Sequence, residues 1–144
     1  MALLAPGVAA GEPSPPGPVT LTEVVSQIDP GATRLSNLTE LLRVRVEAEI
    51  GAIDWSKEGL RRRYKLSASV VRLETSRSGA GLQVSCTISA AVRDAERGTL
   101  LATIEGRARV EGASSAGTSA EQDALTGAVH SAIGAVPEAI RQTK

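Results

Sequence analysis

The chain has 144 residues, 16 of them basic and 16 acidic, so its formal net charge at pH 7 is zero. This length fits one domain with tails, and the zero net charge argues against the strong positive field of a dedicated nucleic-acid binder. Only Trp55 and Tyr64 are aromatic, so the core must be built from aliphatic side chains whose backbones approach closely.

The N-terminal segment 1–18 joins a short apolar run to a proline-rich stretch. Val8-Ala9-Ala10 matches the small-residue pattern before a signal-peptidase cleavage site, although the basic region that normally precedes the apolar run is missing. Two interpretations stay open: the segment is the remnant of a signal peptide, or it is the disordered tail of a cytosolic protein. In both cases we expect residues 1–18 to lie outside the fold and residues 19–144 to form a single α+β domain.

The first part of that domain is predicted to be largely helical. Residues 19–28 suit either a short helix or a strand, and Asp29, Pro30 and Gly31 then predict a turn. Residues 35–52 carry apolar side chains at both strand and helix spacing. Their Leu, Glu, Arg and Ala content and their Arg–Glu pairs four residues apart favour a helix.

Three successive strands are predicted by alternating apolar and polar residues. In the first, the alternation changes phase at Val71 and Leu73, which indicates either a β-bulge or a strand covered on both faces. The second and third are joined by a tight hairpin loop in which Gly98 suits a positive φ. The predicted strands cover residues 64–75, 82–92 and 99–111. In the last two, the alternation places Leu100 inward and Thr87, Arg107 and Arg109 outward.

A last helix is predicted after the strands. Thr118 and Glu121 have the spacing of a capping box, and small alanines recur along the apolar stripe that follows. Gly134 and Pro137 predict a kink or a break near its end. The expected fold is therefore α+β, a three- to four-stranded antiparallel meander with two helices packed on one face in the order α-β-β-β-α.

The residues that could carry chemistry are few. His130 is the single histidine, and we interpret it as a helix surface residue. Cys86 faces inward among aliphatic residues, which indicates a buried structural thiol rather than a nucleophile, and a lone cysteine cannot form a zinc cage. Ser78 to Gly81 lies between two strands and predicts a hairpin, not a phosphate loop. We therefore predict no catalytic residue, no cofactor, no metal and no enzyme activity.

A basic cluster is the candidate functional site. Arg61, Arg62 and Arg63 follow a predicted helix end and precede a strand, so they should lie at an exposed corner. One interpretation is that they keep this corner soluble. The other is that they bind a partner, with Trp55 and Tyr64 supplying the apolar part of the contact.

The second half of the chain carries a resemblance. The run RRRYKLSASVVRLE, the hairpin GLQVSCTISAAVRDAERGTLLATIEGRARVEG and the helix AEQDALTGAVHSAI cover most of residues 60–141. This pattern resembles small exported domains of the Gram-negative envelope, the CsgG, LpoB and TolB N-terminal group. Because members of that group are scaffolds and accessory subunits, the resemblance implies a non-enzymatic periplasmic domain. We expect it to bind a protein partner through its sheet or through residues 57–65. The lipid-anchor cysteine of its lipoprotein members is missing here.

The alternative function is a cytosolic basic-patch module that binds nucleic acid. The predicted element order also suits a double-stranded-RNA-binding domain, which carries basic residues at the start of its last helix. Here that helix starts with acidic residues, at Glu121 and Asp123, which repel phosphate. No stretch approaches the roughly 20 apolar residues needed to span a bilayer.

Overall fold

The computed structural model of the chain describes residues 18–29, 31, 33, 35–58, 60, 62–113 and 117–143. The expectation of a tail at 1–18 therefore falls, except for Pro18, outside the described residues. The elements are β1 (Val19–Ser26), α2 (Leu38–Ala52), the 3₁₀ helix η2 (Trp55–Glu58), β2 (Tyr64–Ser78), β3 (Gly81–Asp94), β4 (Leu100–Ala113), α3 (Gly117–Gly134) and α4 (Val136–Gln142).

The sheet is mixed rather than purely antiparallel, which corrects the predicted meander. Its strand order is β1-β2-β3-β4, with β2, β3 and β4 antiparallel and β1 parallel to β2. Val19 lies opposite Tyr64 and Val24 opposite Ala68, so residues 19–26 resolve as a strand. Parallel strands need a long crossover, and α2 supplies it.

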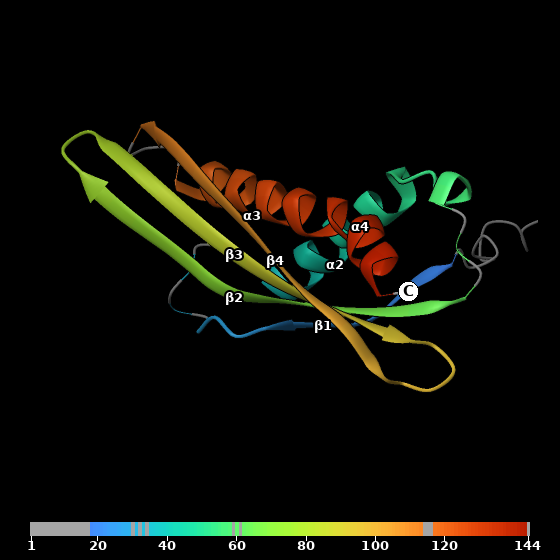
Figure 1. Cartoon of the computed structure of the whole chain (residues 1–144). Coiled ribbons are helices and arrows are strands. Elements are labelled where there is room, and N and C mark those ends of the chain that lie inside the picture. The colour runs from blue at the N-terminus through green and yellow to red at the C-terminus, as the bar shows by residue number, and fades with distance from the viewer. Residues whose placement is uncertain are drawn as a thin grey trace, which may run out of the picture.

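The helices α2, α3 and α4 lie on one side of the sheet, as Figure 1 shows. The helix α2 packs against β1 and β2, whereas α3 packs against β3 and β4. The prediction of helical cover on one face is thus confirmed, but the order is β-α-β-β-β-α-α because β1 precedes α2 and the last helix is divided. The division falls at Ala135, where Gly134 and Pro137 predicted a break.

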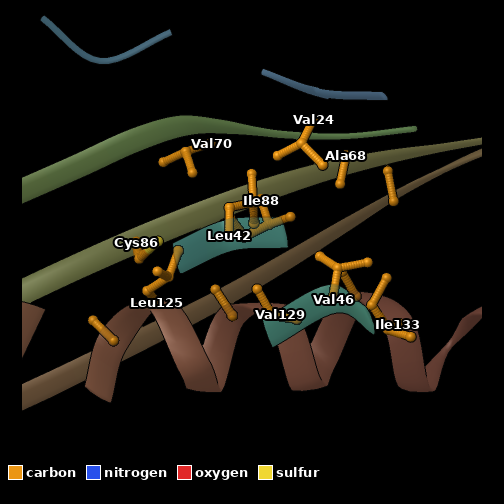
Figure 2. Close-up of a cluster of buried hydrophobic side chains, with 14 of the residues drawn as sticks. Val24, Leu42, Val46, Ala68, Val70, Cys86, Ile88, Leu125, Val129 and Ile133 are labelled. Carbon is orange, nitrogen blue, oxygen red and sulfur yellow. The ribbon is translucent and has the colours of Figure 1, made fainter. Parts of the chain in front are cut away.

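The core is a single aliphatic layer between the sheet and the helices. Side chains from β1, β2 and β3 point into it from one side, and side chains from α2 and α3 from the other, as Figure 2 shows. Leu100, which the alternation placed inward, is instead 49% exposed, because the register of β4 against β3 shifts after Val92 and pairs Leu100 with the exposed Arg93. The largest fully buried side chains are Leu42, Leu66, Ile88, Leu125, Ile133, Ile140, Val46, Val70, Val84, Val92, Val129 and Val136.

Local predictions about turns and caps have mixed outcomes. The register of β2 against β3 shifts between Val70 and Arg72, so the predicted bulge is confirmed. Gly98 has a φ of 73°, as its hairpin position required. The capping box is wrong in its placement, because α3 already begins at Gly117 and Thr118 lies within its first turn.

The side chain of Glu121 has a different use in the structure. It is only 2% exposed, and its Oε1 accepts a hydrogen bond of 2.5 Å from the Thr33 hydroxyl. That hydroxyl in turn accepts a bond from the Leu35 N–H. The segment before α2 is thereby fastened to the start of α3.

Helix α3 and strand β4 approach each other closely at Gly106 on β4. A Cβ atom at this position would lie 2.3 Å from the Ala128 carbonyl oxygen and 2.5 Å from the Ala132 nitrogen. Both contacts are with helix backbone, which cannot move aside as a flexible side chain can. Ala124, Ala128 and Ala132 are fully buried along the same stripe of α3, so small residues on both elements permit the contact.

We expect Gly106→Ala to destabilise the fold by about 1–3 kcal/mol, the range typical of overpacked cores. The added methyl group must push α3 away from β4 and open the aliphatic layer. Urea denaturation followed by circular dichroism measures the change. Gly51→Ala in α2 is the matched control, because no atom lies within 4 Å of its Cβ position. It should stabilise the protein by about 0.5–1 kcal/mol through helix propensity. Equal stability of Gly106→Ala and wild type would contradict the close contact.

Candidate functional site

The predicted basic corner lies where the chain enters β2, beside the β3–β4 hairpin. Arg61 lies outside the described residues. Arg62 places its Nη1 3.4 Å from Asp94 Oδ2, and the Arg63 carbonyl accepts a hydrogen bond from the Ala95 N–H. Both arginine side chains are exposed, so the corner presents positive charge, part of which is compensated by Asp94.

The two aromatic residues predicted for this site differ in burial. Tyr64 is 3% exposed and belongs to the core, so its ring offers no surface to a partner. Trp55 in η2 is half-buried against the core, and its indole Nε1 donates a hydrogen bond of 3.0 Å to the Ile50 carbonyl. Partner binding by the corner stays a prediction; among the described residues, Arg62 and Arg63 are exposed and Trp55 is half-buried.

Asp94 organises the hairpin next to the corner. Its Oδ1 accepts hydrogen bonds from the N–H groups of Arg97, at 3.0 Å, and Glu96, at 2.8 Å. These bonds, and then the charge of Arg62, hold the pKa of Asp94 below its ordinary value of 3.8 although burial opposes them. The carboxylate therefore stays ionised and fixes the turn.

The uncovered face of the sheet is the other candidate surface. Residues that alternate with the core positions of β2, β3 and β4 point away from the helices, and many are short and hydroxylated. A shallow hollow of about 700 Å³ lies on this face. Among its lining residues, Arg72, Arg107 and Arg109 are basic and Glu105 is acidic.

Sequence reasoning foresaw part of this surface. The alternation in residues 82–92 and 99–111 predicted that Thr87, Arg107 and Arg109 face outward, and the structure confirms this. The hollow itself was missed, because its lining combines residues of β2 and β4, which lie on either side of β3. The change of phase in β2 was the available signal, since a bulge alters the face on which Arg72 lies.

The other residues with possible chemistry have structural partners. Cys86 is 1% exposed, as predicted, and burial raises the pKa of its thiol to about 12. His130 is exposed on α3, and its Nδ1 lies 2.9 Å from Glu49 Oε1 on α2. Within the described ranges, no group of three or more His, Cys, Asp and Glu side chains could hold a metal ion. No helix of the described chain is long and apolar enough to cross a membrane.

Comparisons with known proteins extend the description of the fold. No family model matches the sequence, and no curated protein matches it. A solved protein of the family DUF330 from Xanthomonas campestris is 16% identical, with a TM-score of 0.54, over 86% of this chain and 85% of its own. A hypothetical protein from Chlamydia trachomatis is 7% identical, with a TM-score of 0.50, over 87% of this chain and 96% of its own. A minor lipoprotein from Acinetobacter baumannii is 10% identical, with a TM-score of 0.47, over 84% of this chain and 94% of its own. The first two show that this chain shares their fold.

We expect the Cys86 thiol to react slowly in the folded protein. With a pKa of about 12, only about one thiol in ten thousand is ionised at pH 8, and the thiolate is the reactive form. A thiol reagent such as Ellman's reagent should label native protein at least about a hundredfold more slowly than protein in 8 M urea. Labelling at equal rates would mean that β3 presents its other face to the helices.

We expect Asp94 to make stability depend on pH in acid. Its pKa in the folded state lies below the ordinary 3.8, so its contribution is complete above that value and is lost as pH falls through the folded pKa. Asp94→Asn keeps the shape but removes the charge. Its free energy of unfolding should be lower than that of wild type at pH 7, and the two should converge below about pH 3.8. Urea denaturation between pH 2.5 and 7 measures this, and a constant difference over that range would exclude the role.

Proposed function

We propose that this protein is a non-enzymatic accessory domain of the cell envelope, periplasmic in location, that binds a protein partner through the uncovered face of its sheet. The observation that carries the proposal is the division of the sheet into two unlike faces. Helices cover one face, and the other presents short polar side chains to which no described element packs. These outward residues are Ser67, Ser69, Ser85, Thr87, Ser89 and Thr103.

The size and texture of this face suit a protein partner. The strands β2, β3 and β4 have 15, 14 and 14 residues. At usual strand spacings they cover roughly 46 Å by 14 Å, or about 640 Å². This lies within the roughly 600–1,000 Å² that each side of a specific interface buries. Short hydroxylated side chains hydrogen-bond without a large entropy cost on ordering. A broad polar face of this kind fits a wet, reversible contact between proteins.

The non-enzymatic part of the proposal rests on how the reactive side chains are used. The Cys86 thiol lies in the core with a pKa of about 12, so it is not a nucleophile at physiological pH. The Asp94 carboxylate accepts hydrogen bonds from backbone N–H groups of its own turn. The imidazole of His130 links α3 to α2 through Glu49. Each group supports the fold rather than a reaction.

The envelope location rests on the sequence. The small residues Val8-Ala9-Ala10 after an apolar run are typical of an export signal, and residues 60–141 resemble exported envelope domains. The covering of one sheet face supports a scaffold role, because the helical layer stabilises the domain and leaves the opposite face open to a partner. The alternative, a cytosolic nucleic-acid-binding module, would place the contact at the basic corner instead.

Site-specific photocrosslinking in the source cell tests the proposal. A photoreactive amino acid replaces Ser69 or Ser89, which lie opposite each other on the open face, or Arg63 at the corner. We expect one protein partner from positions 69 and 89, recovered in the periplasmic fraction. Asp123, exposed on α3, is the control position and should yield no crosslink to that partner. Crosslinks from Arg63 to nucleic acid, with none from the open face, would overturn the proposal in favour of the alternative.

A further inference from the structure

The bulge in β2 changes the face on which one arginine lies. From Tyr64 to Val70, every second residue of β2 is buried. Continued alternation would bury Arg72. Because the register against β3 shifts between Val70 and Arg72, Arg72 is exposed and Leu73 is buried instead. Bulges often redirect a side chain beside a binding site. The surroundings of Arg72 on the open face therefore indicate what this bulge positions it to bind.

Arg72 joins two other arginines on the open face. It lies opposite Thr87 on β3, and Thr87 lies opposite Arg107 on β4. The next row places Ser85 opposite Arg109. All five residues line the hollow of about 700 Å³. The result is two hydroxyl groups set between three guanidinium groups that come from both flanking strands.

The positive charge of the hollow is only partly compensated. Arg107 forms an ion pair of 2.5 Å with Glu105, and Arg72 lies 4.0 Å from Glu74. Arg109 has no hydrogen-bond or ion-pair partner among the described residues. With three arginines and one glutamate in its lining, the hollow has an excess positive charge in a chain whose net charge is zero.

We propose that this hollow binds an extended, acidic segment of a protein partner, whose carboxylates pair with Arg72, Arg107 and Arg109. The inference rests on the proposed function and specifies the chemistry of the partner. Arginine forms bidentate bonds with carboxylates, and the hydroxyls of Ser85 and Thr87 can donate to the remaining oxygens.

The spacing of the arginines favours a polypeptide over a compact anion. Arg107 and Arg109 are alternate residues of one strand, about 6.8 Å apart along it. Alternate side chains of an extended segment have the same spacing, so carboxylates at positions i and i+2 meet both guanidinium groups at once. Arg72 lies two strands from Arg107, about 10 Å away at the backbone, where it meets a third carboxylate. The short side chains of β3 let the segment lie close to the sheet.

Peptide binding to the full chain tests the inference. The probe is a fluorescent peptide of about ten residues in which threonine and glutamate alternate, and its counterpart has lysine in place of glutamate. Fluorescence anisotropy should show roughly tenfold tighter binding of the glutamate peptide, weakening with salt. The variant Arg72→Glu, Arg107→Glu, Arg109→Glu should reverse this preference. Binding of both peptides with equal affinity by wild type would overturn the inference.

A matched control separates the hollow from overall charge. Arg43→Glu, Arg45→Glu, Arg97→Glu makes the same change in net charge on α2 and in the hairpin loop, and it should keep the preference for the glutamate peptide. Loss of preference in this control would mean that net charge, not the hollow, selects the peptide. Competition by inorganic phosphate at a concentration equal to that of the peptide would also overturn the inference, because it would identify a small-oxyanion site.

A photocrosslinking experiment separates this inference from the proposed function. It compares wild type with the hollow variant, Arg72→Glu, Arg107→Glu, Arg109→Glu, each carrying the photocrosslinker at Ser69. If the partner is crosslinked in wild type but lost in the hollow variant, the inference is supported. If the partner is retained by the hollow variant, the inference fails and the open face still binds its partner by other residues. If wild type itself yields no partner, the proposed function fails as well. Circular dichroism of the variant establishes that the exposed substitutions leave the fold intact.

Discussion

The contact between Gly106 and the backbone of α3 is the constraint on which the arrangement depends. A chain with two aromatic residues cannot fill a thick layer between sheet and helix, so it must bring the two backbones together. The glycine on β4 and the fully buried Ala124, Ala128 and Ala132 on α3 make this possible. Dispersion contacts and burial of many small aliphatic groups then replace the large area that aromatic side chains bury elsewhere.

This contact decides how the rest of the sheet is covered. Because α3 is held against β4, α3 covers β3 and β4, and α2 covers β1 and β2 (Figure 1). The Thr33–Glu121 and His130–Glu49 bonds join the segments of the two helices to each other. All the apolar cover is thus placed on one face. The opposite face carries the polar half of each strand, and no described element packs on it.

The open face is not uniform, and its differences come from backbone geometry. Most of its residues are short and polar, but the bulge at Val70–Arg72 adds a third arginine to the pair on β4. One extra residue therefore preserves the core, by turning Leu73 inward, and concentrates charge outside. The basic corner at Arg62 and Arg63, more conspicuous in the sequence, has part of its charge satisfied by Asp94.

The sequence by itself determined the features that depend on local chemistry. Alternation of apolar residues defined β3 and its buried Cys86, the change of phase in β2 revealed the bulge, and Gly134 with Pro137 located the break after α3. Only the tertiary structure decided features that depend on distant partners. Residues 19–26 suited a helix or a strand, and pairing with β2, some 45 residues away, selects the strand. Tyr64 reads as part of a surface cluster, yet β2 pairs with β1 on one side and β3 on the other at this position, and its side chain is buried in the core. The hollow likewise exists only because β3 brings Arg72 and Arg107 to either side of Thr87, a relation between strands that no spacing along one strand contains.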